Sequence, residues 1–122
     1  MKVYNTEKAP ATIGPYSQAY STNGILITSG QISVNPVDGT VPEGIEAQAA
    51  QSCENVGAIL NEAGINFDKV VKTTCFLADM SDFGAFNAIY EKYFTSKPAR
   101  SCVAIKALPK GVLCEIEVIA EL

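Results

Sequence analysis

Two stretches of the chain carry apolar residues at the spacing of an α-helix. In the first, which follows Pro42, they recur every three or four positions and so share one helix face: Ile45, Ala49, Cys53, Val56, Leu60 and Ala63. Gly64 directly after this stripe suits a helix C-terminus. The second starts at Ser81 and Asp82, an N-cap followed by a first-turn acid, and its stripe is aromatic: Phe83, Phe86, Tyr90, Tyr93 and Phe94. The pattern predicts two amphipathic helices.

Stretches rich in β-branched and aromatic residues predict five strands, over residues 16–20, 25–28, 70–77, 101–107 and 113–120. Asn23-Gly24 between the first two is a strong hairpin signal. A short strand near Val3 could precede them. The order β-β-α-β-α-β-β predicts an α+β fold with two helices on one face of a sheet. Because no repeat, low-complexity tract or linker interrupts it, we expect a single domain over residues 1–122.

The last predicted strand has two different faces. One row is apolar and suits the helix side of the sheet: Cys114, Ile116, Val118 and Ala120. The other row mixes carboxylates with an isoleucine: Glu115, Glu117, Ile119 and Glu121. Such a mixed face suits a subunit interface with polar clefts better than open solvent.

The composition of the chain narrows the range of molecules that it could bind. The chain has 122 residues, of which 48% are hydrophobic and 18% charged, and its net charge is −4. It therefore lacks the positive field on which nonspecific nucleic-acid binding relies. A small apolar chain with few charges often hides part of its surface in an oligomer. We find neither a signal-peptide run nor an apolar stretch of about 20 residues, so we expect no membrane association and a cytoplasmic location, with reduced thiols.

The chain contains no histidine, which excludes Ser-His-Asp and Cys-His nucleophile systems and Cys/His zinc sites built within it. The four cysteines form no Cys-x-x-Cys pair, and no phosphate-binding loop is present. We therefore expect no metal and no cofactor. Acid–base chemistry must come from carboxylates, tyrosine, lysine, cysteine, backbone groups or water.

Charged side chains offer two candidates for such chemistry. Arg100 is the only arginine, and its planar fork can bind a carboxylate through two hydrogen bonds, although a lone arginine is more often a solvated surface residue. Glu115 and Glu117 lie two apart on one strand face and could divide acid and base roles. The ordinary alternative is that both face water on an edge strand.

Three segments with uncharged residues are also candidates. Tyr16 follows the rigid turn Gly14-Pro15 and could line a pocket or only anchor the turn. Ser29-Gly30 ends a strand at a glycine, which allows close backbone approach to a ligand or a β-bulge. Asn87 interrupts the helical stripe with an amide, and periodicity does not decide which way it points.

These segments, in this order, resemble the Rid family of reactive-intermediate deaminases, formerly called YjgF. The resemblance covers essentially the whole chain and rests on residues 13–19, 28–32 and 72–74, Asp82-Phe83 with Asn87 and Tyr90, and residues 98–103, 108–110 and 115–117. It implies a chorismate-mutase-like fold with two helices on one face of a mixed sheet. It also implies a homotrimer with a central barrel of sheets, sites in the clefts between subunits and no cofactor.

The resemblance further implies hydrolysis of 2-imino acids, such as 2-iminobutanoate, or their enamine tautomers, such as 2-aminoacrylate, to 2-keto acids and ammonia. Arg100 would bind the substrate carboxylate, with its own carbonyl and the amide of Cys102 fixing the imine and carboxylate ends. Glu115 would position and deprotonate a water. The other lining residues would be Tyr16, Ser29, Gly30 and Asn87.

Two other functions remain open at this point. The first is a non-catalytic trimer whose clefts sense a keto acid or an amino acid, or which binds a protein. The second is RNA cleavage or translation inhibition, which is ascribed to some family members. The net charge of −4 and the lack of any basic run argue against an RNA substrate.

Overall fold

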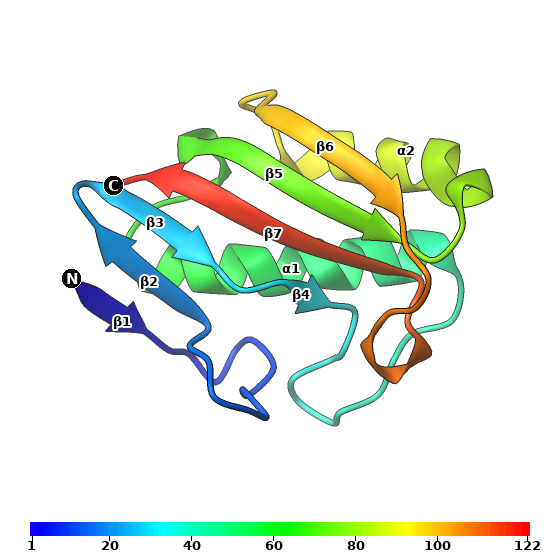
Figure 1. The fold of residues 1–122 in the computed structure, drawn as a ribbon, viewed down its shortest axis with the longest axis horizontal. Helices are drawn as coiled ribbons and strands as arrows, with labels where there is room; N and C mark the ends of the chain where they lie inside the picture. The colour runs from blue at the N-terminus through cyan, green and yellow to red at the C-terminus, as the bar shows by residue number, and fades with distance from the viewer.

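The computed structural model describes all 122 residues and contains one sheet with two α-helices (Figure 1). The elements are, in order, β1 (Lys2–Tyr4), β2 (Ala19–Thr22), β3 (Ile25–Thr28), β4 (Gln31–Ile32), α1 (Ile45–Glu62), β5 (Val70–Leu77), α2 (Phe83–Tyr93), β6 (Ala99–Ala104) and β7 (Cys114–Glu121). Short 3-10 turns occupy Phe67–Lys69, Met80–Asp82 and Pro109–Gly111. No helix of the protein is long and apolar enough to cross a bilayer.

The seven-stranded sheet has the order β1-β2-β3-β7-β5-β6, and β4 also pairs with β7. Only β5 and β6 run parallel, so the sheet is mixed. Both helices lie on one face of this sheet (Figure 1). The predicted α+β arrangement, with two helices on one face of a mixed sheet, is confirmed.

The core lies between the helices and the sheet. The predicted stripe of α1 is buried there, from Ile45 to Leu60, against the apolar row of β7: Cys114, Ile116, Val118 and Ala120. Burying one such aliphatic side chain contributes about 1.5–3 kcal/mol, so this interface supplies a large share of the stability. The alternation predicted for the last strand is confirmed.

The C-terminus of α1 lies where the sequence predicts it, whereas the N-terminus of α2 does not. Gly64 has φ 77° directly after the C-cap of α1, as a terminating glycine requires. Helix α2 begins at Phe83, so the prediction of Ser81 as its N-cap is wrong. The side chain of Asp79 instead accepts a hydrogen bond from the Ser81 backbone N–H at 2.8 Å. A separate 3-10 turn there leaves Asp82 as the N-cap, with no side-chain cap.

Two predicted strands differ from the observed ones by several residues, β7 (Cys114–Glu121) is shifted by one residue from the predicted 113–120, and one strand was missed. β2 starts at Ala19 rather than residue 16, because residues 14–16 form a turn in which the Tyr16 N–H donates to the Gly14 carbonyl. β6 covers 99–104 rather than 101–107, because its single partner β5 pairs only from Lys72 to Leu77. β4, with two residues, is too short to leave a periodic pattern. The short strand near Val3, the hairpin at Asn23-Gly24 and the strand over 25–28 are confirmed.

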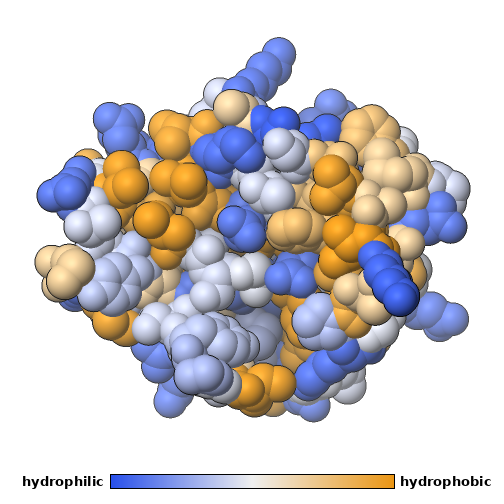
Figure 2. Space-filling view, viewed as in Figure 1, coloured by the Kyte–Doolittle hydropathy of each residue, from blue (hydrophilic) through white to orange (hydrophobic).

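The face of the sheet opposite the helices, here called the open face, is uncovered. Its side chains include the half-buried Glu115, Glu117 and Ile119 of β7. Tyr20, Ile27 and Val103 are large apolar side chains that are 38%, 41% and 44% exposed. Figure 2 shows apolar side chains interspersed among polar ones across the molecule in the view of Figure 1. The mixed character predicted from β7 thus extends over several strands.

Candidate active site

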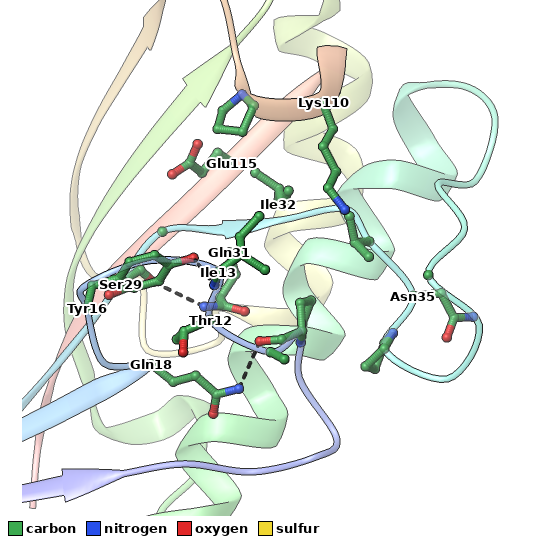
Figure 3. A pocket seen from close by; sticks show the side chains of 17 residues that line it. Thr12, Ile13, Tyr16, Gln18, Ser29, Gln31, Ile32, Asn35, Lys110 and Glu115 are labelled. Atoms are coloured by element: carbon green, nitrogen blue, oxygen red, sulfur yellow. Dashed lines mark hydrogen bonds between the residues drawn. The ribbon is translucent and has the colours of Figure 1, made fainter.

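Four of the sequence-predicted site residues line one cavity: Tyr16, Ser29, Gly30 and Glu115. The cavity has a volume of about 570 Å³ and is bounded by the N-terminal segment, the end of β3, β4, the loop after it and the turn before β7. In Figure 3, Tyr16, Ser29 and Glu115 lie toward one end, and Asn35 lies toward the other. A volume of this size is typical of a small-molecule site.

Backbone and side-chain hydrogen bonds fix the wall that carries Tyr16 and Ser29. The Ser29 N–H donates to the Gln18 carbonyl at 2.8 Å, and the Ser29 hydroxyl donates to the Ser17 carbonyl. The Tyr16 hydroxyl accepts from the Ile13 N–H at 3.5 Å. The segment that follows the turn at residues 14–16 is therefore held against the end of β3.

Gly30 lies directly against Glu115. A Cβ on Gly30 would lie 1.9 Å from Glu115 Oε1 and 2.7 Å from its Cδ, where no side-chain atom fits. The sequence pattern indicated that a glycine here would allow close approach of a ligand, and in the structure the group that lies this close is the Glu115 carboxylate. This contact fixes where the carboxylate enters the cavity.

Glu115 has the properties of a base that can act on a bound water. Its carboxylate is half-buried and accepts no hydrogen bond from any group of the chain. Burial, together with the charge of Glu117, raises the pKa of the Glu115 carboxyl above its ordinary value. A raised pKa brings a carboxylate closer to the range in which general bases work. The neighbouring Glu117 does not line the cavity.

Arg100 and Asn87 lie in another part of the molecule. Arg100 Nη1 donates to Asn87 Oδ1 at 2.8 Å, and the guanidinium lies 4.7 Å from the centre of the Tyr90 ring and 5.4 Å from that of Phe83. Arg100, Asn87 and Tyr90 border a shallow hollow that also includes Lys97. The arginine is therefore half-buried and ordered, which distinguishes it from a solvated surface residue.

The two groups of site residues lie on opposite faces of the sheet. Arg100 pairs with Thr73, whose side chain points toward α2, whereas Glu115 pairs with Phe76 in the row that faces away from the helices. Cys102 belongs to the same row as Arg100 and is half-buried. Burial raises the pKa of the Cys102 thiol, and Arg100 partly offsets that shift. One chain therefore does not bring Arg100 and Glu115 into one cavity.

Sequence reasoning missed two residues that shape these sites. Gln18 is 2% exposed, and its side chain bonds with the backbone of Thr6 and Pro10, so that it holds the N-terminal segment beside the cavity. Tyr90 was assigned to the helix core only. Its spacing from Phe83 and Asn87 places all three on one face of α2, and this spacing was the available signal. No cluster of three or more potential metal ligands is present.

The fold and the cavity define a class: a small α+β protein with a ligand-sized cavity beside an unpartnered carboxylate. Comparison of the sequence with known families then identifies the family. Residues 6–122 match the family described as Endoribonuclease L-PSP, and the chain belongs to this family.

Individual relatives match over nearly the full length. The chain is 51% identical over 123 residues to the 2-iminobutanoate/2-iminopropanoate deaminase of Escherichia coli K12, covering 98% of this chain and 96% of the relative. It is 54% identical over 123 residues to a proposed regulator, AldR, of Lactococcus lactis, covering 99% and 98%. The fold matches that of E. coli TdcF with bound serine at a TM-score of 0.96, with 40% identity and coverage of 100% and 98%. The resemblance to the Rid (YjgF) family is thereby confirmed.

Proposed function

We propose that this protein hydrolyses 2-imino acids and their enamine tautomers, such as 2-iminobutanoate and 2-aminoacrylate, to 2-keto acids and ammonia. The observation that carries this proposal is the Glu115 carboxylate, which is half-buried, has a raised pKa and no partner, and borders a ligand-sized cavity. The relative named as a deaminase of such imino acids supports the same reaction.

The reaction needs few catalytic groups because the imine carbon is already electrophilic. Glu115 accepts a proton from a water whose oxygen attacks C2 of the protonated imine, giving a carbinolamine. That proton then moves to the nitrogen, the C–N bond breaks, ammonia leaves and the C2 hydroxyl loses its proton to become the keto group. The sum is one imino acid and one water converted to one keto acid and one ammonia. Positioning is the main catalytic effect in such a reaction.

The other site residues hold the substrate. Arg100 binds the carboxylate through its guanidinium fork, and the backbone at Arg100 and Cys102 fixes the ends of the substrate. Tyr16, Ser29 and Gly30 form the wall beside Glu115. Asn87 accompanies Arg100, to which it is hydrogen-bonded.

A second copy of the chain is needed to bring Arg100 to Glu115, because the two lie on opposite faces of one sheet. A homotrimer in which three open faces form a barrel meets this need. It would also cover the exposed apolar side chains Tyr20, Ile27 and Val103. Light scattering after size exclusion should give three times the 12.9 kDa chain mass, about 39 kDa. A monomer that remains active would contradict the shared site.

The decisive experiment couples this protein to a serine or threonine dehydratase, which releases the imine in solution. Keto acid and ammonia should appear faster in proportion to the amount of added protein, and they should do so after exhaustive chelation. Unchanged release at any protein concentration would contradict the deaminase function.

Ligand sensing is the second candidate, favoured by the relative proposed to be a regulator and by the serine bound to TdcF. A sensor binds keto acids or amino acids without turning over imines, so the coupled assay separates the two functions. RNA cleavage is suggested by the description of the family. The net charge of −4 argues against it, and intact RNA after incubation with active deaminase would exclude it.

A further inference from the structure

Three side chains of α2 surround the guanidinium of Arg100. Phe83, Asn87 and Tyr90 lie at positions i, i+4 and i+7, so all three point from one helix face toward β6. Asn87 Oδ1 accepts from Nη1 at 2.8 Å, and the two rings lie at 5.4 Å and 4.7 Å from the guanidinium carbon. Both rings are within the range of a cation–π interaction.

Tyr90 is itself held in place. It is 9% exposed, its hydroxyl is 2.7 Å from Thr73 Oγ1, and its ring stacks on that of Phe94 with centroids 4.3 Å apart. Thr73 is the strand partner of Arg100. The sheet and the helix thus fix the ring on which the guanidinium rests, and the arginine is ordered without a ligand.

We infer that Tyr90 and Asn87 are positioning residues that orient Arg100 for a substrate carboxylate, and that Asn87 acts through the arginine rather than on the substrate. This inference rests on the proposed role of Arg100. A long side chain that is ordered before binding loses less conformational freedom when the ligand arrives, so the ligand binds more tightly.

The arrangement also sets the direction of approach. The guanidinium carbon lies over the Tyr90 ring, and Asn87 occupies one N–H at Nη1, while the other N–H donors remain available. A carboxylate therefore binds in the plane of the fork, where two parallel hydrogen bonds form. A lysine at this position has neither the flat face nor the fork.

The experiment uses the fact that Arg100 is the only arginine of the chain. Its Nε–Hε group gives one NMR cross-peak, which the ring current of Tyr90 displaces from the position of a free arginine. We would record this cross-peak, and the affinity for 2-ketobutanoate by calorimetry, in Tyr90→Leu, Tyr90→Phe and Asn87→Ala. Tyr93→Leu is the matched control, because Tyr93 lies on the same helix but packs on Phe67, with ring centres 5.7 Å apart.

Tyr90→Leu should move the cross-peak toward the free-arginine position and weaken binding about 2- to 30-fold, the range of a cation–π contact converted to affinity. Tyr90→Phe keeps the ring and should retain both the cross-peak and the affinity. Asn87→Ala should shift the cross-peak and weaken binding, and Tyr93→Leu should change neither. A wild-type cross-peak and affinity in Tyr90→Leu would overturn the inference.

If Tyr90→Leu does not fold, Asn87→Ala decides the matter, and an unchanged cross-peak and affinity in that variant would overturn the inference. Failure of the proposed function is a separate result. In that case the wild-type protein would turn over no imine, while the displaced Arg100 cross-peak and the binding of 2-ketobutanoate would still be present; a wild-type protein that binds no keto acid would overturn the inference as well.

Discussion

Replacing Gly30 by alanine tests the placement of Glu115 without touching the carboxylate itself. A Cβ at this position would lie 1.9 Å from Glu115 Oε1, whereas an ordinary contact starts at 3.4 Å. The carboxylate must therefore move by about 1.5 Å, the difference between these two distances. A misplacement of about 1 Å can lower a catalysed rate about 100-fold, which corresponds to about 2.7 kcal/mol of transition-state stabilisation.

The fold should tolerate this change. Gly30 is absent from the glycines with positive φ, so alanine can adopt its backbone conformation. The atoms that must give way belong to a flexible side chain at the border of a cavity. Gly→Ala at a compatible position also restricts the unfolded chain, which stabilises the protein by about 0.4–1 kcal/mol. We expect a melting temperature within a few degrees of wild type and a kcat/KM about 100-fold lower in the coupled dehydratase assay.

Gly84→Ala is the matched control. A Cβ at Gly84, in α2, would meet no atom within 4 Å, so turnover should remain at the wild-type level. The double variant Gly30→Ala/Glu115→Gln gives a second check. If the alanine acts through Glu115, the double variant should be no slower than Glu115→Gln alone. Turnover of Gly30→Ala within about threefold of wild type, in a folded protein with the oligomeric state of the wild type, would refute the assignment of Glu115 as the base.

Four further predictions concern the charged groups and the thiols. Glu115→Gln should lower turnover about 100-fold while keto-acid binding persists. Glu117→Gln should keep turnover within a few-fold of wild type but move the acid limb of the pH–rate profile to lower pH, because the charge of Glu117 raises the pKa of Glu115. A carboxyl group whose pKa is raised by folding destabilises the folded protein at any pH where the group is ionised. Glu115→Gln should therefore have a higher melting temperature than wild type at pH 7, and this difference should disappear as the pH falls through the raised pKa to below 4.5. An equal difference in melting temperature at pH 7 and below pH 4.5 would contradict the assigned burial. Arg100→Ala should abolish measurable imine hydrolysis and keep the oligomeric state of the wild type, since losing one charge-assisted pair costs about 1.5–3 kcal/mol, about 10- to 150-fold, before positioning losses. Arg100→Lys should recover only part of the rate, and wild-type rates in Arg100→Ala would exclude Arg100 as the anchor. Iodoacetamide at pH 8 should modify the native protein only at Cys102, as read by mass spectrometry, because Cys102 is half-buried whereas Cys53, Cys75 and Cys114 are buried. Burial raises the pKa of all four thiols, to about 12 for Cys75 and about 11 for Cys114, so the reaction at Cys102 should be slow and should require the accessible side chain.

The sequence alone determined the elements whose residues repeat with a clear period. The stripe from Ile45 to Ala63 and the two rows of the last strand show which side of each element is buried, because burial of apolar area is the dominant favourable term in folding. Asn23-Gly24 fixed the hairpin, because its backbone preferences are local. The motifs around Arg100 and Glu115 also identified the family, which the comparison confirms.

The tertiary structure alone decided how these elements meet. The length of β6 follows from its pairing with β5, and β4 exists only through β7, so neither has a local signal. The partner of Gly30 is a carboxylate far along the chain, and Arg100 lies on the helix side of the sheet while Glu115 lies on the open face. Contacts between residues distant in sequence depend on strand order and register, and periodicity within one segment carries no information about either.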